Sequence, residues 1–144
     1  MGIASVGGHW VQLLRITLAF NDEDVFFVST NPDFASMVPG KKFYHIAEAS
    51  RWNKIRLLKT FWHAFHIVSK EKPDVIVTTG AAPGLMGLMV GWLMGVRTVW
   101  IDSIANVEKI SLSGRIASRF ADRVYTQWPE LASSKIMYAG NVLV

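Results

Sequence analysis

The chain has 144 residues, 51% of them hydrophobic, which is enough for one domain with a sizeable core and too little for two typical domains. We therefore expect residues 1–144 to form a single domain. The absence of cysteine excludes disulfides and thiolate chemistry. The net charge of +4 suits a phosphate-bearing ligand or an anionic membrane surface, but the cations are scattered instead of forming the runs of a nucleic-acid-binding tail, so no nucleic-acid partner is expected.

Strand-like and helix-like segments alternate along the chain. Strands are predicted at Met1–Val6, Val25–Thr30, Phe43–Ile46, Val75–Thr79, Val96–Ile101 and Asp122–Gln127, with a last one near Lys135–Gly140. Helices are predicted from the Gly7-Gly8-His9 turn to Phe20, over Arg51–Lys70, from Pro83 onward and over Ser111–Ala121. This alternation predicts an α/β fold, a Rossmann-like parallel sheet with helices on both faces.

One uncharged apolar segment, residues 75–96, is long enough to imitate a membrane span. It begins with the β-branched run VIVTT and is interrupted by GAAPG before a methionine-rich apolar stretch starts near Pro83. Proline suits the first turn of a helix, and β-branched residues suit a buried strand. We interpret the segment as strand, tight loop and buried helix, with a lipid-embedded helix as the alternative.

Three loops are the candidate functional sites, because ligands of parallel sheets bind at the carboxyl ends of the strands. In the first, glycine amides could approach an anion at a helix start, and His9 could exchange a proton near neutral pH. The second is TTGAAPG, and the third is the polar stretch 101–114, in which Ser111 or Ser113 could also serve only as a helix cap. The candidate substrate-binding residues are Gly7, Gly8, Thr79, Gly80, Ala81, Gly84, Ser103, Asn106, Ser111, Ser113 and Gly114. Each glycine loop could instead be a purely structural turn.

Competing motifs are weak. A dinucleotide site needs an acidic residue after the second strand, where this chain has Asn31, and the P-loop pattern is absent. His63 and His66 are spaced to chelate a metal on one helix, but no carboxylate accompanies them, so a solvated helix face is favoured and no metal or cofactor is expected.

The order of several motifs resembles a known family. GGH near the start, TTGAAPG, and then SIAN, SLSG, QWPEL and YAGN are similar to the oligosaccharide biosynthesis proteins of the asparagine-linked glycosylation fourteen type and their bacterial exopolysaccharide relatives. The resemblance covers nearly the whole chain and is most specific from Asp74 to Leu143. It implies the N-terminal, acceptor-side half of a split GT-B glycosyltransferase, whose partner chain brings the UDP-sugar domain.

The resemblance also implies roles for particular residues. His9 would be the general base for transfer to a lipid-linked saccharide acceptor, with the glycine amides near phosphates. Asp102 is the rival base. The family often has glutamate at the position of Asp102, so the shorter side chain puts a direct role for this residue in doubt. A single Rossmann-like half should be inactive without its partner chain.

Membrane contact is expected to be peripheral, at the cytoplasmic face, because the glycine turn begins close to Met1 where eukaryotic members carry an anchor. The predicted contact is the basic helix that carries Ile55, Leu58, Trp62 and Phe65 at helical spacing, or else the apolar helix after Pro83. On the basic helix, the residues expected to contact the membrane are Arg51, Trp52, Lys54, Arg56, Lys59 and Trp62. Trp100 and Trp92 are assigned to the core.

The last residues form an apolar stretch, and uncovered apolar surface often marks an interface. We expect Val142, Leu143 and Val144, with Trp128, to contact the donor-binding subunit. Two alternatives stay open: a non-catalytic Rossmann-like scaffold that recruits a partner to the membrane, and a fragment of a single-chain transferase.

Overall fold

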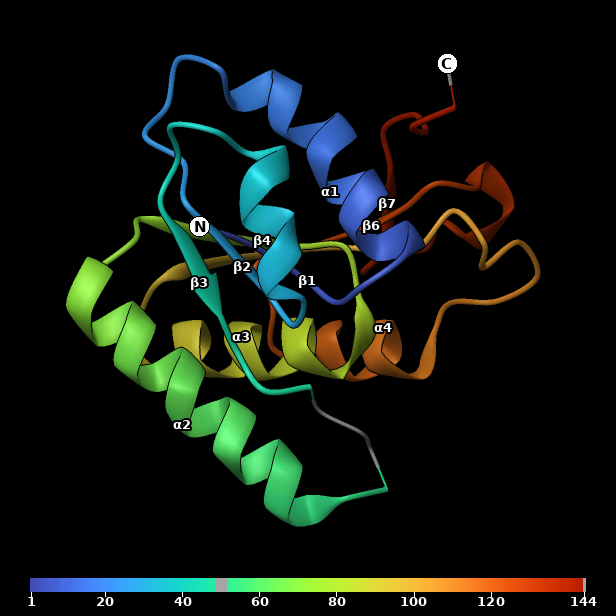
Figure 1. The fold of residues 1–144 in the computed structure, drawn as a ribbon. Helices are drawn as coiled ribbons and strands as arrows, with labels where there is room; N and C mark the ends of the chain where they lie inside the picture. Colours follow the sequence, from blue (N-terminus) through green and yellow to red (C-terminus); the bar gives the residue numbers. More distant parts are fainter. Residues whose placement is uncertain (49–51, 144) are drawn as a thin grey trace.

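The computed structural model describes residues 1–48 and 52–143, and it contains a seven-stranded parallel sheet (Figure 1). The strands are β1 (Gly2–Ala4), β2 (Phe27–Ser29), β3 (Phe43–His45), β4 (Val75–Thr78), β5 (Arg97–Ile101), β6 (Arg123–Thr126) and β7 (Met137–Tyr138). Their order across the sheet is β3-β2-β1-β4-β5-β6-β7, and every neighbouring pair is parallel. The predicted fold class is confirmed.

Helices cover both faces of the sheet (Figure 1). The helices are α1 (Gly8–Thr17), α2 (Lys54–Glu71), α3 (Ala81–Leu93) and α4 (Leu112–Ala117), with 3-10 turns η1 (Leu18–Phe20), η2 (Pro32–Met37) and η3 (Pro129–Leu131). In Figure 1, α1 and η2 lie on one face, whereas α2, α3 and α4 lie on the other. Helix α3 begins two residues before Pro83, which therefore occupies the first turn as proposed.

Each face of the sheet has its own apolar core, as alternation along buried strands requires. On the α1 face, Trp10 stacks on Phe34 with ring centroids 4.9 Å apart and meets Phe27 edge-on. The opposite core contains Ile3, Ile76, Leu88 and Trp100, among others. Trp100 is fully buried as predicted. The assignment of Trp92 to the core is wrong, because this side chain is about half exposed, with its ring against that of Phe120.

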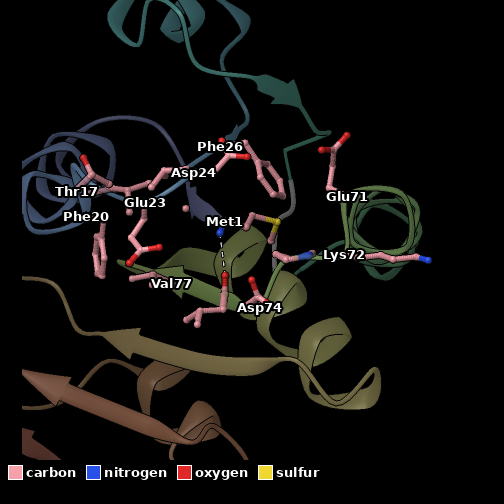
Figure 2. A pocket seen from close by; sticks show the side chains of 15 residues that line it. Met1, Thr17, Phe20, Glu23, Asp24, Phe26, Glu71, Lys72, Asp74 and Val77 are labelled. Atoms are coloured by element: carbon pink, nitrogen blue, oxygen red, sulfur yellow. Dashed lines mark hydrogen bonds between the residues drawn. The ribbon is translucent and has the colours of Figure 1, made fainter.

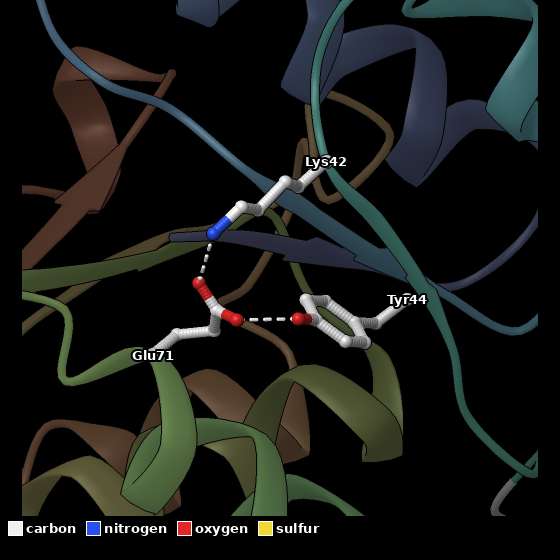
Figure 3. A network of polar contacts seen from close by, with 3 residues as sticks. All are labelled: Lys42, Tyr44 and Glu71. Carbon is white, nitrogen blue, oxygen red and sulfur yellow. Dashed lines mark hydrogen bonds and ion pairs between the residues drawn. The ribbon is translucent and has the colours of Figure 1, made fainter.

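The edge strand β3 is tied to the end of α2 by one polar network. Glu71 accepts hydrogen bonds from the Tyr44 hydroxyl at 2.5 Å and the Lys42 ammonium at 2.9 Å (Figure 3). These donors, Tyr44 first and then Lys42, hold the pKa of the Glu71 carboxyl below its usual range. The contact fixes the edge of the sheet against the helix that returns the chain to β4.

Candidate functional site

Three connections meet at the carboxyl edge of the sheet. The chain leaves β1 toward α1, leaves β4 toward α3, and leaves β5 into the loop that precedes α4. Strands β1 and β4 are neighbours, but β1 is followed by β2 on one side and β4 by β5 on the other. This reversal of strand order is the place where open parallel sheets bind ligands.

A hollow of about 280 Å³ lies at this edge. The residues that line it are His9, Gly80, Ala81, Ala105, Asp102, Ser103, Asn106, Ser111, Leu112 and Ser113. All of these except Ala105 and Leu112 were singled out from the sequence. The structure therefore brings residues from all three candidate loops to one place.

His9 is the proton-exchanging group of the hollow. It stands in the first turn of α1, half-buried, and its Nδ1 lies 2.8 Å from the carbonyl oxygen of Thr79. The Thr79 hydroxyl in turn donates to the carbonyl oxygen of His9 at 2.6 Å. The β1–α1 and β4–α3 connections are thus joined by two hydrogen bonds across 70 residues of sequence.

Backbone strain marks the start of α3. Gly80 has a φ of 129°, and Ala81 follows with a φ of 66°, which an L-residue adopts at some cost. Gly7, the residue before α1, also has a positive φ, of 73°. The first-turn amides of a helix lack intrahelical partners, so the starts of α1 and α3 can both donate to an anion at this edge.

Asp102 is buried and fully engaged. Its side-chain oxygens accept hydrogen bonds from the Trp100 indole, the Asn106 amide, and both the backbone N–H and the hydroxyl of Ser111, at 2.6–3.0 Å. The residue is only 1% exposed. Ser111 also caps α4 by accepting from the Gly114 N–H at 2.9 Å, which is the capping role considered above. This carboxylate organises the β5–α4 loop.

Five of the expected substrate-binding residues do not line the hollow. A Cβ built on Gly84 would lie 2.0 Å from the Thr78 hydroxyl, and one built on Gly114 would lie 2.7 Å from an Asp102 oxygen. Both glycines permit close strand–helix packing. Thr79 is fully buried, with its hydroxyl on His9. Gly7 and Gly8 are exposed at the start of α1, beside the hollow in sequence but outside its lining.

Two buried glutamines, neither of them predicted as a substrate-binding or catalytic residue, support the site. The side-chain amides of Gln12 and Gln127 both donate to the backbone carbonyl of Asp102, at 3.2 and 2.9 Å. Gln12 also accepts from the backbone N–H of Ile104. A glutamine within the apolar run WVQLL was the available signal, since a buried amide requires partners.

The outer face of α2 is apolar and basic. The helix packs on the core through Thr60, Ala64, Ile67 and Val68, and the stripe of Ile55, Leu58, Trp62 and Phe65 faces outward instead. Ile55 is 70% exposed and Trp62 59%. Trp52, Lys54, Arg56 and Lys59 are exposed as well, as are His63 and His66, whereas Arg51 lies outside the described residues. Within the described parts of the chain, none of the helices is long and apolar enough to cross a membrane.

The C-terminal segment is held at the same edge as the hollow. The backbone N–H of Val142 donates to the Gln127 side chain at 3.0 Å, and its carbonyl accepts from Arg15 of α1 at 3.0 Å. The Trp128 indole donates to the carbonyl of Ile104. Leu143 is 64% exposed, and Val144 lies outside the described residues.

A larger hollow, of about 390 Å³, lies at the opposite, amino-terminal edge of the sheet (Figure 2). There the Met1 nitrogen donates to the Val75 carbonyl at 2.8 Å, and Glu23, Asp24 and Asp74 surround it. This edge receives helix C-termini instead of N-termini, and its lining is acidic. Its four carboxylates, those of Glu23, Asp24, Glu71 and Asp74, outnumber the Met1 ammonium and its one lysine, Lys72, and this disfavours a phosphate. The smaller hollow is therefore the candidate site.

Comparison with known proteins gives a match to one protein family and to several sequence relatives. Residues 45–142 match the family described as "Oligosaccharide biosynthesis protein Alg14 like". The UDP-N-acetylglucosamine transferase subunit alg14 of Schizosaccharomyces pombe is 37% identical over 78 residues, which cover 51% of this chain and 35% of that protein. The UDP-N-acetylglucosamine–N-acetylmuramyl-(pentapeptide) pyrophosphoryl-undecaprenol N-acetylglucosamine transferase of Nitrosospira multiformis is 34% identical over 88 residues, covering 60% of this chain and 24% of the relative.

The fold has a match among solved structures. The crystal structure of Acinetobacter baumannii MurG superimposes with a TM-score of 0.76 at 16% identity, covering 97% of this chain and 46% of that one. The match supports the Rossmann-like fold of the GT-B type. The matched regions amount to about a third or less of the two sequence relatives and to less than half of the MurG chain.

Proposed function

The chain belongs to the family of Alg14-like oligosaccharide biosynthesis proteins, and from this premise we propose that it is the acceptor-side subunit of a two-chain glycosyltransferase. The complex would transfer N-acetylglucosamine or a similar hexose from a UDP-sugar to a lipid-linked saccharide. The observation that carries the proposal is His9, which stands in the first turn of α1, lines the polar hollow beside the start of α3 and is oriented by the Thr79 carbonyl.

The names of the relatives support the reaction class. One is a subunit of a UDP-N-acetylglucosamine transferase, and the other transfers N-acetylglucosamine to a pyrophosphoryl-undecaprenol acceptor. A GT-B enzyme places its reaction between two Rossmann-like domains. This chain matches about half of the MurG chain, and in the proposal a partner subunit supplies the donor-binding half.

In the proposed reaction, the acceptor hydroxyl attacks the anomeric carbon of the donor sugar. The new bond joins the acceptor oxygen to that carbon, the bond from the carbon to the UDP oxygen breaks, and UDP leaves with the electron pair. Nε2 of His9 takes the proton of the hydroxyl, as a general base. Amides at the starts of α1 and α3 would face the phosphates of the acceptor lipid or the donor. Asp102 is less suited to be the base, because its oxygens already accept four hydrogen bonds.

The outer face of α2 would hold the complex at a membrane. The helix carries Lys54, Arg56, Lys59 and Lys70 but no acidic residue before Glu71, and its exposed aromatic and aliphatic side chains lie among these cations. This composition is typical of helices that lie in the interface of an anionic bilayer. Because α2 follows β3 in the chain, it starts near the carboxyl edge of the sheet, where the candidate site lies. A lipid-linked acceptor held at α2 could therefore reach that site. We place this contact at the cytoplasmic face.

The partner subunit would cover the carboxyl edge. Val142 is held there by Gln127 and Arg15, with Leu143 exposed beside it and Trp128 half-buried nearby. A partner seated on this edge would close the hollow from above, where the second domain of a GT-B enzyme sits relative to the first. Val144 is included in the proposed contact as the next residue of the segment.

The test is transfer by the reconstituted complex. This chain, co-purified with the candidate donor-binding subunit, should transfer label from UDP-N-acetylglucosamine to a lipid-pyrophosphate saccharide, and neither chain alone should do so. His9→Ala should lower the turnover of the complex by about 10²–10⁴-fold without reducing co-purification. The matched control is His45→Ala, an exposed histidine at the end of β3. Transfer by the isolated chain would overturn the split-enzyme proposal, and full activity of the His9→Ala complex would favour a non-catalytic scaffold.

A further inference from the structure

Thr79 is the residue that holds the imidazole of His9 in place. Nδ1 of His9 lies 2.8 Å from the Thr79 carbonyl oxygen, and a carbonyl oxygen can only accept. Nδ1 must therefore carry the hydrogen. A neutral imidazole has one N–H, so in this tautomer Nε2 has a free lone pair.

The same pair of residues is joined a second time, in the reverse direction. The Thr79 hydroxyl donates to the backbone carbonyl of His9 at 2.6 Å, and the Thr79 side chain is fully buried. This bond holds the first turn of α1 against the loop that supplies the accepting carbonyl. The side chain of Thr79 thus keeps its own backbone carbonyl in line with the imidazole.

The loop leaves the imidazole little room to turn. A Cβ built on Gly80 would lie 2.7 Å from both Cε1 and Nδ1 of His9, so the ring packs directly on the glycine backbone. The Gly80 N–H donates to the Thr78 hydroxyl at 3.2 Å, which fixes the glycine in turn. The position of the ring is thereby set from two sides.

We infer that Thr79 is a positioning residue, which holds His9 in the Nδ1–H tautomer and so reserves Nε2 as the atom that accepts the proton. The sequence-based assignment of Thr79 to substrate binding is replaced by this role. The inference rests on the proposed function for its catalytic meaning, whereas the tautomer is a property of the chain itself.

The first test measures the tautomer without any substrate. The ¹⁵N-labelled chain at a pH where His9 is neutral should give a pyrrole-type Nδ1 and a pyridine-type Nε2, assigned by comparison with His9→Gln. In Thr79→Val, which loses the hydroxyl, the spectrum should shift toward the Nε2–H form or a mixture. Thr79→Ser should restore the original pattern. Thr17→Val is the matched control, because it removes a threonine hydroxyl bond to a backbone carbonyl at the far end of α1.

The second test is kinetic, on the complex with its partner. Thr79→Val should lower kcat by about tenfold, the effect of one misplaced hydrogen bond, and should leave the KM for the acceptor within about twofold. Thr79→Ser should recover most of the loss. A stably folded Thr79→Val chain with unchanged tautomer and kcat would overturn the inference, and so would an Nε2–H tautomer in the unmodified chain. If instead the tautomer is as inferred and the His9→Ala complex remains active, the catalytic role proposed for His9 fails, while the control of its tautomer by Thr79 stands.

Discussion

The hydroxyl of Ser111 donates to the carboxylate of Asp102 at 2.6 Å, and this bond ties the residue after β5 to the N-cap of α4. Because four donors converge on that carboxylate, Asp102→Asn would place an amide N–H against a donor. We expect a loss of about 2–4 kcal/mol in the free energy of unfolding, measured with urea.

Asp22→Asn, at an exposed position, is the control for Asp102→Asn and should change stability by less than about 0.5 kcal/mol. A similarly small loss at Asp102 would show that the network has no structural importance. If Asp102→Asn were stable and its complex inactive, Asp102 would return as the candidate base.

Replacing Gly80 should disturb His9 directly. A Cβ at this position would lie 2.7 Å from the imidazole, and the φ of 129° is unfavourable for alanine. We expect Gly80→Ala to displace the ring and to lower transfer by at least about tenfold. The His9 ring resonances in an NMR spectrum report the displacement.

The control for this variant separates crowding from backbone strain. Gly95→Ala also changes a glycine with positive φ, of 73°, but a Cβ there meets nothing within 4 Å. It should lower stability and leave His9 unmoved. Equal His9 spectra in the two variants would contradict the proposed steric contact.

Removing the cations of α2 should weaken binding to anionic vesicles. Each cation near an anionic surface contributes about 1 kcal/mol, so replacing Lys54, Arg56 and Lys59 of α2 by glutamine, together with Arg51, which precedes α2 in the sequence, should weaken binding at least about tenfold and reduce its salt dependence. Flotation with phosphatidylserine vesicles measures both effects.

The control for α2 is a second set of four glutamine substitutions with the same change in net charge. These are at Lys41, Lys109, Arg119 and Lys135, which are exposed elsewhere on the molecule. The control set should reduce binding much less than the α2 set. Equal losses would mean that only net charge matters and that α2 is not the contact.

The exposed leucine of the C-terminal segment should contribute to partner binding. Leu143→Asp would put a charge into the proposed interface, and we expect co-purification with the donor-binding subunit to weaken by at least about tenfold. Leu18→Asp, at an equally exposed leucine in η1, should have no effect. Undiminished recovery of the partner by Leu143→Asp would place the interface elsewhere.

Acid should remove one specific contribution to stability. The Asp122 carboxylate accepts from the backbone N–H and then the hydroxyl of Thr98, and these bonds lower the pKa of the carboxyl. Because the native pKa lies below the unfolded value of about 3.9, the stabilisation is present above that value and is lost as the pH falls through the native pKa.

Asp122→Asn should therefore be less stable than the unmodified chain at pH 7, and the difference should shrink below about pH 4. Urea unfolding at a series of pH values measures it. A difference that is constant from pH 7 to pH 3 would contradict the assignment.

The order of the elements could be predicted because strand-like apolar runs alternate with helical patterns, and the interior strands β1, β2 and β4 are buried as parallel strands are. The edge at which the candidate site lies could also be predicted, since parallel strands place their following loops together. The contact of His9 with Thr79 could not be predicted, because the two residues are 70 positions apart and neither residue type implies the other.

The helix α2 shows a different limit. Its apolar residues at positions 55, 58, 62 and 65 form one stripe, as their spacing indicates, but periodicity does not say which stripe faces the core. The helix packs on the core through Thr60, Ala64, Ile67 and Val68. Their small and β-branched side chains allow α2 to approach α3 closely. The larger side chains of Ile55, Leu58, Trp62 and Phe65 remain exposed.

The position of β1 in the sheet bears on how the chain folds. Gly2 pairs with Phe27 on one side and with Val77 on the other, so this interior strand is completed only by a segment more than seventy residues away. Pairings of such sequence separation close large loops before they gain contact energy, which slows folding. During synthesis, β1 must wait until β4 has emerged from the ribosome, and until then one of its edges is an unpaired template for aggregation.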